Sequence, residues 1–321
     1  MLRQHHLQGC FDQLGMGVVL CCHHGDESLS MMTAGRIDAH IHLYDGGRPQ
    51  GLPWPPAESP LPRTVLVEHW RQQARRYAVE AAVVVEASHW PADNDWLLDQ
   101  ADQHLDILGV IGNLSPHSPL FASELDRLIH RRRWKGVRWR HDLVPMQASD
   151  PAVVCAALQL AERNLLLEVN GPSWMTYEVA ALAEAVPELR IVIDHAGLPG
   201  DPQRLQPDWF GAITAVARHP SVAIKLSGLQ EQTDRSSECF GEAPREPSYY
   251  QVVLEHCWSC FGAERLMFAS NWPASEAGGS YGDALALVES FFQKRGSKAE
   301  ERYFRTNVQS IYGLNPGRMG S

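Results

Sequence analysis

The sequence lacks the features that define membrane and nucleic-acid-binding proteins. It contains no uninterrupted apolar run close to the ~20 residues that a membrane-spanning helix requires. Basic residues are few, because 28 Lys and Arg stand against 38 Asp and Glu, giving a formal net charge of −10. No basic stripe with interleaved aromatic residues offsets this surplus of acid. We therefore expect neither a membrane nor a nucleic acid as a partner.

Cysteine is also scarce. The 321 residues include seven cysteines, an odd number at irregular spacings. This usage is typical of reduced thiols in a cytoplasmic protein and does not suggest a disulfide framework. The absence of a glycine-rich loop after the first predicted strand further disfavours an open, doubly wound nucleotide-binding sheet.

The most informative stretch is 36–43, which has the sequence Arg-Ile-Asp-Ala-His-Ile-His-Leu. Its alternation predicts a buried strand that carries His40 and His42 on one face, with Asp38 below them. Two imidazoles at a strand end can hold one divalent ion or act together on a substrate oxygen. The alternative is a chance pair in a chain with 15 histidines.

Short β-branched runs alternate with helical periodicity along the rest of the chain. The eight predicted strands cover 36–43, 81–87, 107–114, 134–140, 165–171, 190–197, 222–229 and 265–273. Predicted helices between and after them include 64–77 and 298–312. This pattern predicts an α/β fold, a (β/α)8 TIM barrel forming one domain over 36–314. Residues 1–35 are predicted to be a poorly packed extension and 315–321 a tail.

Polar residues interrupt the apolar runs near the end at which a barrel carries its reactive groups. Burying such charges is costly unless they have a partner or a task, so we expect an active or binding site there. Asp194 and His195 are adjacent, and only one of them is expected to point inward. The residues concerned are His40, His42, Glu86, Arg138, Arg140, Glu168, Asp194 or His195, Lys225 and Asn271.

Six short stretches give the chain a family resemblance. They lie at 37–42, 83–88 with Asp93 and Asn94, 135–138, 194–197 with Pro199, 225–228 and 265–273. Over about 36–314 the sequence resembles the amidohydrolase superfamily, in particular the metal-sparing lactonases that act on sugar acids and related compounds. That group includes L-fuconolactonase, L-rhamnonolactonase and 2-pyrone-4,6-dicarboxylate lactonase. The resemblance implies a TIM barrel that hydrolyses a lactone or another ester-like or amide bond in a small molecule.

Two positions depart from the patterns of the superfamily. Asn271 stands where the family pattern has an aspartate that binds metal or activates water, and an amide cannot accept a proton near neutral pH. Glu168 stands where metal-rich members have a histidine, a change shared with the lactonases, which argues against a dinuclear metal site.

The resemblance suggests roles for these groups. His40, His42 and His195 would hold one Zn²⁺ or Mn²⁺, or would donate hydrogen bonds to the substrate carbonyl in a metal-independent reaction. Glu86 or Glu168 would act as the general base, although Glu168 suits equally well a buried partner for a nearby cation.

Substrate contacts are expected from charged and aromatic side chains. Arg138, Arg140 and Lys225 would bind a carboxylate or a hydroxyl-rich edge, or else form structural salt bridges. Trp54 and Trp90 would form walls for a sugar ring, or else pack within loops.

Three functions follow from these residues. The first is a hydrolase, most consistent with a lactonase, acting as a monomer or a homo-oligomer. The second is a lactone isomerase or lyase, because Asn271 removes base strength and leaves carbonyl polarisation intact. The third is a non-catalytic barrel that binds a sugar acid.

Overall fold

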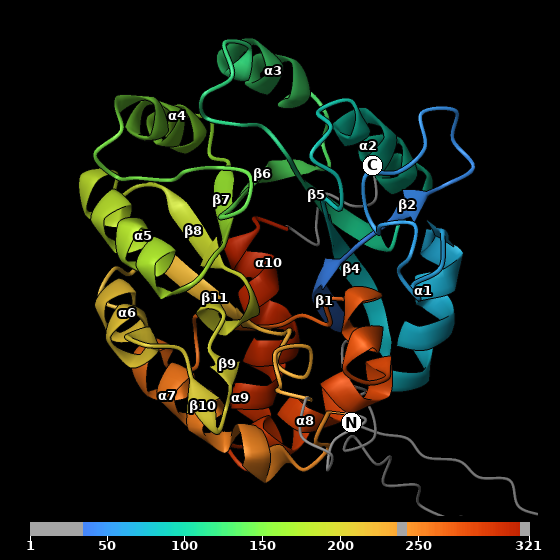
Figure 1. Cartoon of the computed structure of the whole chain (residues 1–321), viewed down its shortest axis with the longest axis vertical. Helices are drawn as coiled ribbons and strands as arrows, with labels where there is room; N and C mark the ends of the chain where they lie inside the picture. Colours follow the sequence, from blue (N-terminus) through green and yellow to red (C-terminus); the bar gives the residue numbers. More distant parts are fainter. Residues whose placement is uncertain (1–34, 236–242, 315–321) are drawn as a thin grey trace, which may run out of the picture. The chain divides into compact units, whose positions relative to one another are not determined.

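The computed structural model describes residues 35–235 and 243–314. Their main feature is an eight-stranded parallel sheet that curls into a nearly closed barrel (Figure 1), which confirms the predicted TIM-barrel fold. The strands, in spatial order, are β1 (Arg36–Ile41), β4 (Val79–Val85), β5 (Ile107–Gly112), β6 (Trp134–Arg140), β7 (Leu166–Asn170), β8 (Arg190–Ile193), β11 (Val222–Leu226) and β12 (Leu266–Phe268).

Helices alternate with these strands and cover the outside of the barrel (Figure 1). The longer ones are α1 (Val67–Ala74), α2 (Asp93–Gln103), α3 (Phe121–Leu128), α4 (Pro151–Glu162), α5 (Ser173–Ala185), α6 (Trp209–Val216), α7 (Gln251–Phe261) and α8 (Tyr281–Gln293). Short 3₁₀ turns cover η2 (Arg75–Tyr77), η3 (His195–Gly197), η4 (Pro247–Tyr250) and η5 (Ala274–Ala277).

Two predicted helices differ from the structure. The helix expected over 64–77 begins at Val67, because β3 (Thr64–Val65) pairs antiparallel with β2 (Tyr44–Asp45). The Thr64 hydroxyl also donates to the Asp45 carboxylate over 2.9 Å. The helix expected over 298–312 consists of α9 (Ser297–Glu301), the π-helical turn η6 (Arg302–Thr306) and α10 (Asn307–Ile311). A further small ribbon joins β9 (Gly200–Asp201) to β10 (Arg204–Leu205).

The first and last strands meet through main-chain contacts just beyond their ends. Ile41 and Trp272 form a parallel bridge. The His42 N–H donates to the Trp272 carbonyl over 2.8 Å, and the Asn271 N–H donates to the His40 carbonyl over 2.9 Å. This closure seam brings His42, which directly follows β1, next to Asn271.

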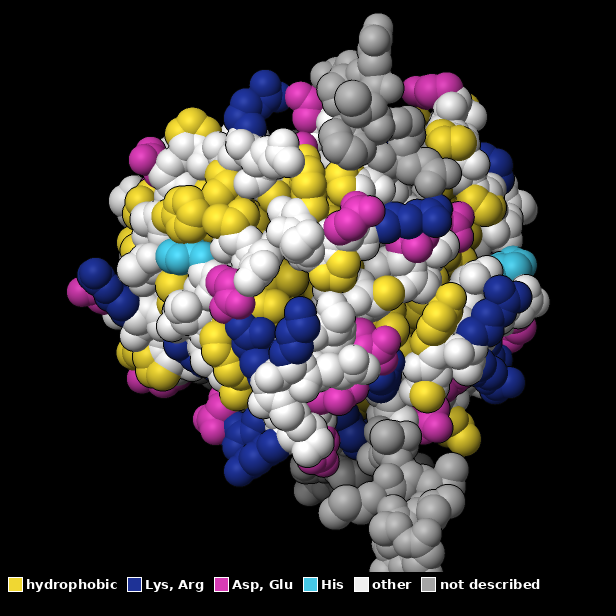
Figure 2. Space-filling model, turned by 90° about the horizontal axis from the view of Figure 1, so that it is seen from below, with side chains coloured by type: hydrophobic (Ala, Val, Ile, Leu, Met, Phe, Trp, Pro, Cys, Tyr) yellow, Lys and Arg dark blue, Asp and Glu magenta, His cyan; other side chains and the backbone are white. Residues whose placement is uncertain are grey.

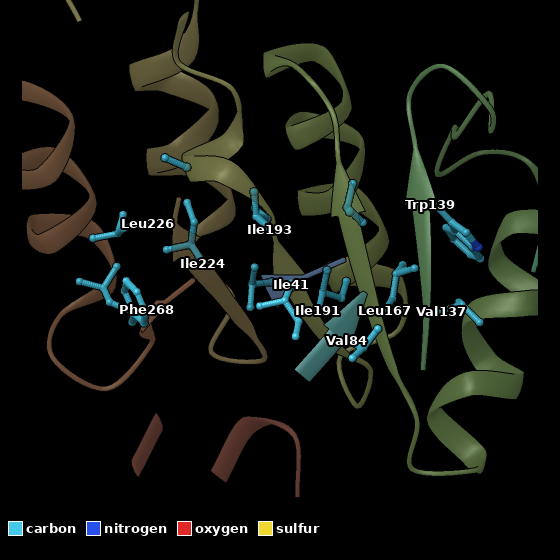
Figure 3. Close-up of a cluster of buried hydrophobic side chains, with 14 of the residues drawn as sticks. Ile41, Val84, Val137, Trp139, Leu167, Ile191, Ile193, Ile224, Leu226 and Phe268 are labelled. Atoms are coloured by element: carbon cyan, nitrogen blue, oxygen red, sulfur yellow. The ribbon is translucent and has the colours of Figure 1, made fainter. Parts of the chain in front are cut away.

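The apolar core has two layers. The outer layer lies between strands and helices, and Figure 3 shows some of its members, including Val137, Ile224 and Phe268. The inner layer fills the barrel and includes Val308 and Tyr312 from the C-terminal segment. In keeping with this, α10 lies at the centre of the helix ring in Figure 1.

Inward-facing residues change from apolar to polar along the strands. On β7 the inner-layer residue Leu166 is followed two positions later by buried Glu168, and on β11 Ala223 is followed by buried Lys225. The period of two places both members of each pair on one face. An apolar floor therefore supports a layer of buried ionisable groups.

Charged side chains of both signs are interspersed on the face seen in Figure 2. Within the described ranges, every helix is too short or too polar to cross a membrane. The predicted tail over 315–321 lies outside the described residues, as does the predicted extension over 1–35, apart from Gly35.

Replacing Leu167 by alanine tests the outer core layer. Leu167 is fully buried on β7, so Leu167→Ala should lower the free energy of unfolding by about 2–5 kcal/mol, from lost burial and the cavity left behind. The matched control is Leu105→Ala, at a leucine that is 79% exposed, with an expected change within about 0.5 kcal/mol. Urea unfolding followed by circular dichroism measures both, and equal effects would contradict this assignment of the core.

Candidate active site

Three histidines from two distant parts of the chain meet at one end of the barrel. The His40 ring lies 4.8 Å from the His42 ring and 4.8 Å from the His195 ring, measured between centroids. The Nε2 atoms of His40 and His42 are 3.2 Å apart. All three side chains are buried. The structure thus brings together the imidazoles that the sequence proposed as one group.

The backbone of β1 is irregular where it carries the first of these histidines. The pairing of β1 with β4 shifts register between Asp38 and Ile41. His42 is held by its Nδ1, which donates to the Val85 carbonyl over 3.0 Å and so leaves Nε2 as an acceptor. Asp38, expected below the imidazoles, accepts hydrogen bonds from the His40 and Ser270 N–H groups and from the Tyr281 hydroxyl of α8.

Asp194 and His195 both reach the site, so the expectation that only one points inward is wrong. Strand β8 ends at Ile193, and His195 has a positive φ of 52°. The alternation of a strand therefore no longer applies to this pair. The Asp194 carboxylate lies 3.4 Å from His40 Nδ1, and His195 Nδ1 lies 2.9 Å from the Ser227 hydroxyl.

A fully buried lysine occupies the centre of the ionisable layer. The Lys225 ammonium lies 2.6 Å from Glu168 Oε2, 3.0 Å from Asp194 Oδ1 and 3.1 Å from His40 Nδ1. The Tyr312 hydroxyl donates to the other oxygen of Glu168. Lys225 thus forms hydrogen bonds with Glu168 and His40 and an ion pair with Asp194, and its side chain is fully buried, which favours a structural role over the substrate contact that we expected.

Arg138 spans the opposite side of the same layer. Its Nε donates to Glu86 Oε1 over 2.8 Å and its Nη2 donates to the Glu86 carbonyl over 2.7 Å. Its Nη1 lies 3.3 Å from His40 Nε2 and 3.6 Å from Asp194 Oδ2. These contacts favour the alternative that we named for Arg138, a structural salt bridge, over a direct substrate contact. Arg140 binds Asp142 and is less buried.

Burial determines the protonation of these groups. It lowers the pKa of His42 to about 3 and that of His195 to about 4, and it holds that of His40 well below its usual value. Burial also raises the pKa of Glu168 to about 7, against the opposing charge of Lys225. Burial alone would raise the pKa of Asp194, but the Lys225 cation lowers it well below its ordinary value. The imidazoles are therefore neutral near pH 7.

Asn271 faces His42 and a carboxylate that sequence reasoning missed. Its Oδ1 lies 3.2 Å from His42 Nε2, and its Nδ2 donates to Glu231 Oε1 over 2.9 Å. Burial raises the pKa of Glu231. Glu231 lies in the irregular segment after β11, where no periodicity predicts a side chain's direction, so no sequence pattern indicated it.

The two tryptophans proposed as walls differ in position. The Trp54 ring lies 5.5 Å from the His42 ring and packs edge-on against Tyr44, so the long loop after β2 reaches the site. Trp90 packs against His89. Among the residues that the structure describes, no ring contact or hydrogen bond links Trp90 to the three imidazoles.

The donor atoms fit a single divalent ion. Ligand atoms of His40, Asp194 and His195 all lie within 4.8 Å of one another, a set in which Asp194 replaces the predicted His42. Neither Asp194 oxygen accepts a hydrogen bond of normal geometry, although the cations of Lys225 and Arg138 are near. Imidazole and carboxylate donors of this kind suit Zn²⁺ or Mn²⁺.

Polar groups converging beyond the carboxyl ends of eight parallel strands define a TIM-barrel enzyme. The chain belongs to the Amidohydrolase family, whose model matches residues 37–314.

An L-fucono-1,5-lactonase of Burkholderia ambifaria is 28% identical over 287 residues, which cover 87% of this chain and 96% of that protein. Among solved structures, an amidohydrolase from Burkholderia multivorans with bound zinc has a TM-score of 0.76 at 24% identity, covering 88% of this chain and 100% of that one. A putative 2-pyrone-4,6-dicarboxylic acid hydrolase from Pseudomonas putida has a TM-score of 0.71 at 20% identity, covering 88% and 98%. These similarities agree with the fold and family predicted from the sequence motifs.

The depressed pKa of His195 predicts a pH dependence of stability. Between pH 6.5 and about 4 the unfolded chain protonates His195 and the folded chain does not, so acidification across this window favours unfolding. In chelator-treated protein, the drop in unfolding free energy over this window should be about 3 kcal/mol smaller in His195→Gln than in the wild type. His130→Gln, at an exposed histidine, is the control. Parallel pH profiles for wild type and His195→Gln would show that burial does not hold His195 neutral.

Proposed function

We propose that this protein hydrolyses the lactone of a sugar acid or of a similar carboxylated compound. The observation that carries the proposal is the cluster of three neutral, buried imidazoles beside paired carboxylates at the barrel mouth. Opening a lactone requires a polarised carbonyl, an activated water and a proton for the leaving alkoxide. Similarity to an L-fucono-1,5-lactonase along most of both chains supports the same substrate class.

The imidazoles polarise the substrate carbonyl. His195 binds Ser227 through Nδ1, and within the described ranges no hydrogen bond engages its Nε2. His40 supplies a neighbouring N–H at Nε2, whereas His42 presents only a lone pair at Nε2 because its Nδ1 donates to Val85. A carbonyl oxygen bound between His40 and His195 gains hydrogen bonds that strengthen as negative charge develops in the transition state.

Glu231 is our candidate for the proton acceptor. Glu86 and Glu168, the bases first considered, form ion pairs with Arg138 and Lys225, which gives them a role in charge balance. Glu231 instead binds the neutral Asn271 amide and is half-buried. It would take a proton from water as the oxygen attacks the carbonyl carbon. The same proton would pass to the ring oxygen as the C–O bond breaks.

Substrate recognition is assigned to groups at the rim. Arg140 is partly exposed and can offer a planar guanidinium to a carboxylate or to vicinal hydroxyls. Trp54 lies against His42 and provides an apolar surface for a ring.

A divalent ion, Zn²⁺ or Mn²⁺, would be held by His40, Asp194 and His195, with His42 next to them. Such an ion supplies Lewis-acid polarisation of a carbonyl and lowers the pKa of bound water. The Burkholderia multivorans relative was crystallised with zinc.

The direct test is acid release from a panel of aldonolactones, with chelator or with added Zn²⁺ or Mn²⁺. We expect turnover of at least one lactone and a loss of about 100-fold or more in His195→Ala, because its carbonyl contact is removed. His130→Gln should keep wild-type rates. Binding without turnover would favour a non-catalytic sugar-acid barrel, and a rearranged or cleaved product without acid release would favour an isomerase or lyase.

Restoring the family aspartate tests the roles of Asn271 and Glu231. In Asn271→Asp a carboxylate would face Glu231 at hydrogen-bond distance, so the repulsion should lower kcat/KM about tenfold. The double variant Asn271→Asp/Glu231→Gln keeps one carboxylate and one amide in the pair and should recover most activity. A gain in the single variant would instead show that the natural chain has moved away from hydrolysis.

A further inference from the structure

We propose that Lys225 is a positioning residue: an internal cation that fixes His40 in its Nε2–H tautomer and thereby weakens divalent-ion binding through His40 Nε2. The proposal depends on hydrogen-bond geometry around His40. Its consequence for catalysis, in which His40 donates a hydrogen bond to the carbonyl, rests on the proposed lactonase function.

The contacts of Lys225 define the tautomer. A lysine ammonium carries only donors, so the 3.1 Å contact to His40 Nδ1 requires a lone pair on that nitrogen. The proton of neutral His40 is then on Nε2, which lies 3.2 Å from His42 Nε2. Because His42 Nδ1 donates to Val85, its Nε2 is an acceptor. Lys225 therefore donates to His40, His40 donates to His42, and His42 donates to Val85, so the three hydrogen bonds run in one direction.

The opposite tautomer is less favourable without an ion. A proton on His40 Nδ1 could reach Asp194 at 3.4 Å but would face the ammonium of Lys225 at 3.1 Å. It would also leave two lone pairs facing each other at 3.2 Å, on His40 and His42. It would satisfy the Arg138 Nη1 donor at 3.3 Å, a contact that the Nε2–H tautomer leaves repulsive. The 3.2 Å contact between His42 Nε2 and Asn271 Oδ1 pairs two acceptors in either His40 tautomer and does not distinguish them.

An ion held through His40 Nε2, together with Asp194 and His195, would require this less favourable tautomer. The His40 Nε2 lone pair would have to be free for the ion, so the His40 proton would have to move to Nδ1, against Lys225. The ammonium also repels a divalent ion within the same buried cluster. The positive charge of Lys225, fixed in place by the fold, therefore opposes the binding of an exchangeable divalent ion.

The first experiment determines the tautomer of His40 directly. Imidazole ¹⁵N chemical shifts of chelator-treated protein, assigned with His40→Gln, should show protonated Nε2 in the wild type. In Lys225→Met the proton should move to Nδ1, where Asp194 accepts it. A wild-type spectrum with the proton on Nδ1 would overturn the proposal.

The second experiment measures zinc affinity by competition with a chromophoric chelator. Lys225→Met should bind Zn²⁺ at least about tenfold more tightly than the wild type. Lys298→Met removes the same charge from an exposed site and is the matched control, with unchanged affinity expected. Equal or weaker zinc binding by Lys225→Met would overturn the proposal.

Removing Lys225 leaves Glu168 and Asp194 buried with less positive charge, which can impair folding. The double variant Lys225→Met/Glu168→Gln removes one charge of each sign and should show the same tautomer change and tighter zinc binding. Neither readout uses a lactone, so failure of the proposed hydrolysis would leave both results interpretable. A double variant that folds and retains the wild-type tautomer and affinity counts against the proposal.

Discussion

Compensation of buried charge is the constraint on which the site depends. Glu86, Glu168 and Asp194 lie inside the barrel and form ion pairs with Arg138 and Lys225. Leaving any of these charges without a partner in so dry a layer would cost several kcal/mol. The apolar floor beneath them excludes water, and the pairing makes that burial tolerable.

This balance explains the chemistry available to the histidines. With two cations nearby and little solvent, His40, His42 and His195 remain neutral and offer lone pairs or N–H groups. Asn271 fits the same pattern, since an amide at the seam adds no further negative charge beside Glu231. The departure from the family aspartate is thus matched by a carboxylate supplied from a different segment.

Most of the fold was predictable, because strand alternation and helical periodicity are properties of short segments. The pairing of His40 with His42 followed from the period of two on β1. The inward direction of both Asp194 and His195 did not, since it depends on the positive φ of His195 after the strand ends. Glu231 was equally hidden, because only tertiary contacts determine where an irregular segment directs its side chains.

The closure seam also determines when the site can exist during folding. His42 and Asn271 are 229 positions apart in the chain, and they meet only through the contacts that join the first strand to the last. Contacts over such sequence separations carry a large entropic cost of loop closure and tend to form late. A nascent barrel missing its last strand would already contain the histidine pair and the buried lysine, yet it would be catalytically incomplete. The complete group of His42, Asn271 and Glu231 therefore forms only when the barrel closes.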